Sequence, residues 1–223
     1  MGVNWKNRSV GGVWCGYLRS TGVFLCLALT CLLFLGTRTA QAQRGAITLP
    51  RNLSDLSSTA DRIVQGKVIS VRVEPHPDYK NLKTLLITLE VDDTLKGGTS
   101  KTFTFRQFIW DVRDISDGAG YRIGDEVLLF LNRPTPLGLI SPVGLEQGRF
   151  RVVKDRNGED LAINGNGNSS LLSGRLIESG TLNTSKLSAR SRSAMQSFKQ
   201  GPIDLNALKE SVRVLLQSGT GAK

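Results

Sequence analysis

Residues 84–95 carry the pattern that most restricts how this chain can fold. Leu85, Ile87, Leu89 and Val91 recur at every second position, and polar residues fill the positions between them except at Leu86. A period of two with one apolar face is the pattern of a half-buried β-strand. A strand of this kind needs neighbouring strands with which to pair.

Further short segments have the composition of strands. They lie at residues 62–73, 102–106, 127–131, 149–153 and 161–163, with room for one more near Leu139. Gly66 predicts a bulge or bend in the first segment, and residues 127–131 are apolar on both faces, as in a central strand. Asn157 and Gly158 predict a hairpin turn, because both tolerate positive φ. Five or six such strands without alternating helices predict an all-β barrel or sandwich.

The rest of the chain divides by composition. Residues 43–56 form a polar N-terminal leader, with capping residues at 52–57 that favour one short helical turn. Residues 57–165 hold the predicted strands, and residues 166–201 are rich in Ser, Gly and Asn, which predicts a flexible linker. Residues 202–219 carry apolar side chains at helical spacing behind a capping Asp204, which predicts an amphipathic C-terminal helix.

The first 42 residues have the organisation of a secretory signal peptide. A basic start leads into a 13-residue apolar run at 23–35, shorter than the roughly 20 residues of a membrane-spanning helix. Ala40-Gln41-Ala42 then matches a small-x-small cleavage pattern. We expect cleavage after Ala42 and secretion to the periplasm or the cell exterior. Retention as an uncleaved anchor is the alternative, because Arg38 follows the apolar run.

Cysteine usage and charge exclude several classes of site. Cys15, Cys26 and Cys31 all lie before the expected cleavage point, so the mature chain has no disulfide, thiol nucleophile or thiolate metal site. A disulfide-free exported chain fits a bacterial envelope protein. The net charge of the whole chain is +10, yet residues 43–167 carry only +1. A nucleic-acid surface would concentrate basic charge on the folded domain, so we expect no nucleic-acid partner.

Two segments of the predicted β domain resemble a known group of barrels. The sequences ADRIVQGKV at 60–68 and RIGDEVLLFL at 122–131, with a strand between them that ends at Leu95-Lys96-Gly97, resemble motifs of the netrin/TIMP-like OB-fold barrels. The resemblance covers residues 57–154 and implies a small OB-like Greek-key β-barrel of five to six strands. Inhibitors in that group chelate a protease's zinc through an N-terminal cysteine. The mature chain has no cysteine, so the resemblance implies the fold and not that inhibition.

Few residues suggest catalysis or metal binding. His76 is the only histidine, and a catalytic zinc site needs about three protein ligands. An exposed loop position is the simpler interpretation of His76, beside a role as partner to a serine nucleophile. Residues 155–160 partly match a calcium loop, but its twelfth position is Asn166 rather than glutamate, and a plain hairpin explains the same residues. We predict no catalytic residue, no metal site and no cofactor.

The candidate binding residues are Phe108, Ile109, Trp110 and Tyr121, in a predicted long loop at 107–123. Exposed aromatic residues often anchor interfaces, although such a tip can instead fold back to plug one end of a barrel. The function that follows is a monomeric, exported, non-catalytic module that binds an unknown protein. The alternatives are a hydrolase with an unrecognised site and an envelope-associated structural protein whose basic tail contacts anionic polymers.

Overall fold

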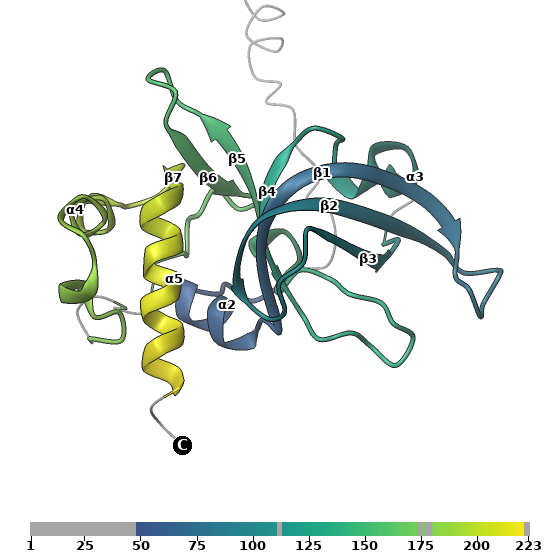
Figure 1. Ribbon diagram of the computed structural model, residues 1–223, viewed down its shortest axis with the longest axis horizontal. Helices are drawn as coiled ribbons and strands as arrows, with labels where there is room; N and C mark the ends of the chain where they lie inside the picture. Colours follow the sequence, from purple (N-terminus) through teal and green to yellow (C-terminus); the bar gives the residue numbers. More distant parts are fainter. Residues whose placement is uncertain (1–47, 111–112, 174–175, 177–179, 221–223) are drawn as a thin grey trace, which may run out of the picture. The chain divides into compact units, whose positions relative to one another are not determined.

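A computed structural model describes residues 48–110, 113–173, 176 and 180–220. Figure 1 shows one β-sheet with helices beside it. The strands are β1 (Arg62–Pro75), β2 (Lys83–Lys96), β3 (Thr102–Phe108), β4 (Glu126–Leu131), β5 (Arg149–Lys154), β6 (Asp160–Asn164) and β7 (Ile203–Asp204). The α-helices are α2 (Leu53–Thr59), α3 (Arg113–Asp117), α4 (Ala189–Ser197) and α5 (Leu205–Thr220), and the 3-10 turns are η1 (Gly118–Gly120), η2 (Leu145–Gln147) and η3 (Thr184–Lys186).

The sheet contains seven strands in the order β3-β2-β1-β4-β5-β6-β7, and every pairing between named strands is antiparallel. The mostly-β prediction is therefore confirmed, as is the C-terminal helix. The sheet is not closed by a continuous ladder between its edge strands, which differs from the predicted barrel of five to six strands. The residues near Leu139, where the sequence leaves room for one more short strand, do not form a strand. Two isolated bridges occur there instead, a parallel one between Arg106 and Leu139 and an antiparallel one between Leu131 and Pro142.

The long β1–β2 ribbon follows the predicted alternation. Leu85, Ile87 and Leu89 on β2 are fully buried. The register of β1 against β2 shifts between Gln65 and Gly66, so the predicted irregularity at Gly66 is confirmed. A side chain at Gly66 would place its Cβ 2.2 Å from the carbonyl oxygen of Glu90. The glycine is needed because the two backbones approach closely, and this approach bends the ribbon.

Strand β4 separates two apolar clusters. Leu128 and Phe130 face a cluster shared with α2 and α5, whereas Val127, Leu129 and Leu131 face a second cluster formed with β1, β2 and β3. Successive side chains of a strand point to opposite faces of its sheet, so a strand covered on both faces must be apolar throughout. The prediction that residues 127–131 form a central strand is confirmed.

The helices begin at local capping signals. The Asn52 side chain accepts a hydrogen bond from the Asp55 amide, and the Asp55 carboxylate accepts one from the Asn52 amide, which makes a capping box at α2. At α5 the Asp204 carboxylate accepts a hydrogen bond from the Ala207 amide at 2.7 Å. The predicted N-cap of the C-terminal helix is therefore confirmed. Apolar residues of α5, among them Leu208 and Val212, belong to the same cluster as α2.

The structure differs from the flexible linker predicted at residues 166–201. The described part of this segment contains α4 and buries Leu171, Leu182 and Met195 in the same cluster as α5. Asn168, which is itself buried, donates hydrogen bonds to the carbonyls of Ala162 (2.9 Å) and Gly201 (2.8 Å). The Asn168 side chain therefore links the start of the segment to β6 and to the end of the segment at Gly201. A segment rich in Ser, Gly and Asn forms packed turns here.

Charged side chains attach α5 to the β1–β2 ribbon. Lys209 Nζ and Arg213 Nη2 each lie 2.6 Å from Asp93 Oδ2, and Lys209 also donates to Gln65 Oε1 at 2.6 Å. Partial burial alone would raise the pKa of the Asp93 carboxyl. The hydrogen bond and charge of Lys209, together with Arg213, outweigh that effect and hold the pKa of Asp93 below its usual value.

This depressed pKa predicts an acid-sensitive contribution to stability. Because the pKa is lower in the folded than in the unfolded chain, ionised Asp93 stabilises the fold above about pH 4, and the stabilisation is lost as the pH falls through the folded-state pKa. We expect Asp93→Asn to cost about 1 kcal/mol at neutral pH, and the difference from wild type to shrink in acid. Urea melts at a series of pH values test this. Asp92→Asn, at a neighbouring position, is the control, and equal losses in both variants would contradict the prediction.

Candidate binding surface

The four predicted binding residues divide between the surface and the interior. Phe108 ends β3 and is 36% exposed, and Trp110 two residues later is 57% exposed. Their rings meet edge to face, with centroids 5.1 Å apart. Ile109 is half-buried against the cluster between β1, β2 and β3, and Tyr121 is buried in it. Two of the four residues therefore face inward, and two form an exposed aromatic pair.

Tyr121 is held by contacts on several sides. Its hydroxyl lies 3.4 Å from Gln107 Oε1, its ring meets Phe105 edge-on at 6.0 Å, and the Arg149 guanidinium lies 4.9 Å above its face. Burial raises the pKa of the Tyr121 phenol, although the Arg149 charge acts in the opposite direction. Enclosed in this way, the Tyr121 phenol packs against the inner side of the loop and supports it.

The exposed pair stands on a fixed backbone. The Trp110 amide donates a hydrogen bond to Asp114 Oδ2 at 3.0 Å, and Asp114 itself is buried in the first turn of α3. On the other side, Phe108 is held in register with Thr84 of β2. An exposed tryptophan whose backbone is already ordered loses little conformational entropy when a partner covers it. The arrangement suits an interface anchor.

His76 is buried, contrary to the exposed loop position expected from its neighbouring prolines. It is 4% exposed, and its Nε2 lies 2.7 Å from the carbonyl oxygen of Leu137. Its Nδ1 accepts a hydrogen bond from the Asp78 amide at 3.2 Å. Since a carbonyl only accepts, Nε2 must carry the proton. Both ring nitrogens are engaged, so the ring as placed has no free lone pair with which to act as a general base. Instead it joins the tip of the β1–β2 ribbon to the loop after β4.

The segment considered as a calcium loop is a hairpin turn. Asp155 Oδ1 accepts hydrogen bonds from the amides of Asn157 (2.8 Å) and Glu159 (2.9 Å), and the segment joins β5 to β6. The prediction of a hairpin at Asn157-Gly158 is confirmed. Across the described ranges, no three His, Cys, Asp or Glu side chains gather in a way that could hold a metal ion.

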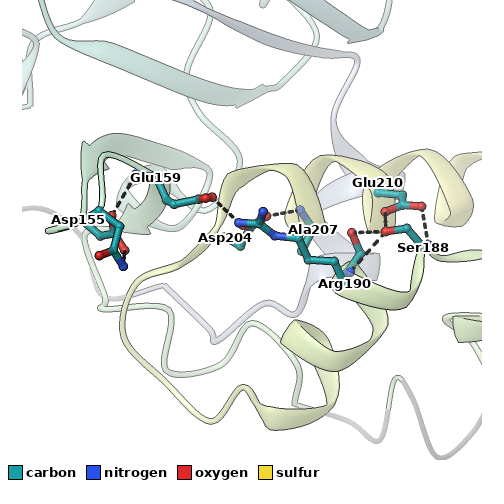
Figure 2. A network of polar contacts seen from close by, with 9 residues as sticks. Asp155, Glu159, Ser188, Arg190, Asp204, Ala207 and Glu210 are labelled. Atoms are coloured by element: carbon teal, nitrogen blue, oxygen red, sulfur yellow. Dashed lines mark hydrogen bonds and ion pairs between the residues drawn. The ribbon is translucent and has the colours of Figure 1, made fainter.

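The arginines of the basic segment around α4 bind acidic side chains and backbone carbonyls of the protein itself. Figure 2 shows Arg190 between the carboxylates of Glu159 and Asp204, the latter 3.2 Å away. Glu210 of α5 accepts hydrogen bonds from the amide (2.7 Å) and the hydroxyl (2.8 Å) of Ser188, which caps α4. Arg192 donates to backbone carbonyls in and just after η3, the turn that precedes α4, among them that of Thr184. These contacts fasten α4 to α5 and to the β5–β6 hairpin, which leaves less basic charge for an anionic polymer.

Comparison with known proteins adds no family to this picture. No protein-family profile matches the chain, and no curated protein matches it. Within the ranges that the structure describes, no helix has both the length and the apolar character needed to cross a bilayer. Any function must therefore be argued from the surface itself.

Proposed function

We propose that the chain is an exported, non-catalytic binding module that contacts a protein partner in the cell envelope or outside the cell. The observation that carries the proposal is the exposed Phe108–Trp110 pair on an ordered backbone. Aromatic anchors of this kind supply much of the binding energy of protein interfaces. Export rests on the signal-peptide organisation of residues 1–42, which lie outside the described residues.

The finer fold we propose is an OB-like barrel of the netrin/TIMP-like kind. The two isolated bridges support it, because they connect the edge strand β3 to β4 through residues 139–142. The Ile140 amide donates to the Arg106 carbonyl at 2.7 Å, and the Asn132 amide donates to the Ser141 carbonyl at 3.0 Å. In this interpretation residues 139–142 act as a rudimentary closing strand, and β5, β6 and β7 extend the sheet on its other side.

Replacing Trp110 by alanine tests the proposed interface. We expect a change in unfolding free energy within about 0.5 kcal/mol, because most of the indole is in solvent. We expect a loss of roughly 30-fold or more in affinity for the partner, as is usual for a hot-spot residue. The measurement is crosslinking capture by residues 43–223 from the envelope fraction of the native cell, followed by titration of the captured protein.

Leu49→Ala is the matched control, since Leu49 is an exposed apolar residue outside the 107–123 segment. If both variants capture the partner as wild type does, Phe108 and Trp110 are not the interface. A large loss of stability in Trp110→Ala would show instead that the indole belongs to the core.

A further inference from the structure

One stretch of β1 has a strand on only one side. β4 pairs with β1 from Arg62 to Lys67, and Val68 forms backbone hydrogen bonds with residues 124 and 125. From Ile69 to Pro75 the described residues provide only β2 as a partner strand. In an antiparallel ribbon, alternate residues direct their N–H and C=O groups away from the partner strand. This stretch therefore presents backbone donors and acceptors on the side where β4 has ended.

A groove with apolar and polar lining residues runs beside the open edge. It has a volume of about 460 Å³ and lies between the end of β1 and the segment that contains α3 and η1. Its lining includes Val71 and Val73 of β1 together with Ile115 and Ile123. Ile123 is 70% exposed and Ile115 is 41% exposed. An open strand edge with alternating apolar pockets beside it is the arrangement that binds an extended peptide by strand addition.

Positive charge borders the groove. Arg122 lines it and is exposed, and within the described part of the chain no ion pair or hydrogen bond engages its guanidinium. On the other face of β1, Arg72 and Arg106 share the carboxylate of Glu74, at 3.3 and 3.6 Å. Two guanidiniums on one carboxylate leave an excess positive charge. An incoming strand with acidic side chains would balance it.

The same charge disfavours a second copy of this chain at the edge. In a symmetric antiparallel pairing of two copies, the Arg72 side chains would lie near each other, and like charges across a strand pair are destabilising. The bulge at Ile69 and the proline at 75 also limit the stretch open to pairing. The arginine charge, the bulge and the proline together disfavour pairing with further copies of the chain. They leave a short stretch of edge that can accept an acidic segment.

We propose that the open edge of β1 from Ile69 to Pro75 binds an extended, acidic segment of a partner protein as an added β-strand, with its apolar side chains in the groove beside Ile115 and Ile123. This inference rests on the proposed function, because it names the kind of segment that the binding module takes. Phe108 pairs with Thr84 of β2, and Thr84 pairs with Glu74 of β1. The aromatic pair therefore lies at the same end of the sheet as the open edge, and one partner can cover both.

A synthetic peptide tests the site directly. The probe is acetyl-Thr-Val-Glu-Val-Glu-Val-Thr-amide, titrated into residues 43–223 and followed by amide hydrogen exchange and NMR shifts. We expect exchange at residues 69–75 to slow about tenfold or more at saturation, as backbone groups become paired. A peptide with lysine for each glutamate, and one with N-methyl groups on alternate residues facing β1, should each bind about tenfold more weakly or worse.

Variants of the protein complete the test. Arg72→Glu should weaken binding of the acidic peptide about tenfold or more, because the peptide's glutamates would lie on the face of the sheet that carries Arg72. Arg156→Glu, on the distant β5–β6 turn, should not. Unchanged exchange at residues 69–75, or equal binding of the N-methylated peptide, would overturn the proposal. So would protection of these amides that rises with protein concentration alone, because a second copy would then cover the edge.

The peptide test and the Trp110→Ala test can fail separately. Strand addition that persists in Trp110→Ala, while partner capture is unaffected by that variant, would support the edge and refute the aromatic anchor. Capture that depends on Trp110 without any peptide binding at β1 would refute the edge and keep the proposed function.

Discussion

Phe130→Ala is expected to lower the free energy of unfolding by about 3–5 kcal/mol, which corresponds to a fall of roughly 10 °C in the melting temperature of a domain of this size. Phe130 is the penultimate residue of β4 and is fully buried, and its ring centroid lies 5.5 Å from that of Phe150. It belongs to the cluster that joins the sheet to α2 and α5. Truncation would leave a cavity enclosed by several elements, none of which can collapse into it without moving the others.

The control for Phe130 is the same substitution at a surface position. Phe108→Ala removes an equal number of atoms from a ring that is partly in solvent, and we expect it to cost less than about 1 kcal/mol. Thermal and urea melts of both variants measure the difference. Equal losses would mean that β4 does not have the two-sided burial described for it.

Gly66→Ala is expected to destabilise the protein by at least about 3 kcal/mol, even though it adds a single methyl group. The new Cβ would lie 2.2 Å from the Glu90 carbonyl oxygen and 3.1 Å from Val91 Cα. Both obstacles are backbone atoms of the neighbouring strand, so no side-chain rotation can relieve the clash. The two strands would have to separate at the bend, and hydrogen bonds of the β1–β2 ladder would be lost.

Gly124 is a control that distinguishes the cost of a steric clash from the cost of an unfavourable backbone conformation. Gly124 has a φ of +96°, but no atom lies within 4 Å of the position that an alanine methyl group would take there. Gly124→Ala should therefore cost only the conformational penalty of about 1–2 kcal/mol. Yield of folded protein and melting temperature are the measurements. A Gly66→Ala protein that melts within about 2 °C of wild type would contradict the close approach of β1 and β2.

Patterns that arise within a few residues of each other were predictable here. The alternation at residues 84–95, the Asn-Gly turn and the Asp204 cap each reflect local geometry, and the structure contains all three. The strand at 127–131 was also evident, because burial on both faces requires an unbroken apolar run. Such signals locate elements along the chain. They carry little information about how a sheet of seven strands ends or closes.

Features that depend on distant partners were missed. Burial of His76 requires the Leu137 carbonyl from a loop beyond β4, and proline neighbours suggested only a surface loop. Leu171, Leu182 and Met195 are isolated in a polar composition without helical or strand periodicity, and they become buried only because α5 and β6 lie beside them. The single signal in that segment was the recurrence of leucines, alone or beside one other apolar residue, among serines and glycines.

The candidate surface was predictable only in part. The aromatic content of residues 107–123 identified the segment. In a loop, however, no sequence periodicity shows whether an aromatic side chain faces inward, as Tyr121 does, or outward, as Trp110 does. The open edge of β1 could not be predicted at all. It exists because β4 begins only at Glu126, opposite Lys67. The second half of β1, a longer strand, therefore has β2 on one side and no strand on the other among the described residues.

The joining of α2 to α5 has a consequence for biosynthesis. Leu53 and Leu56 of α2 pack in one cluster with Leu208 and Val212 of α5, and the Leu53 amide bonds to the Leu171 carbonyl at 2.8 Å. Among the described elements, α2 precedes all the strands and α5 follows them, and the two helices share one cluster. A ribosome would release α5 only after the whole sheet had been made, so this half of the core cannot assemble on the growing chain.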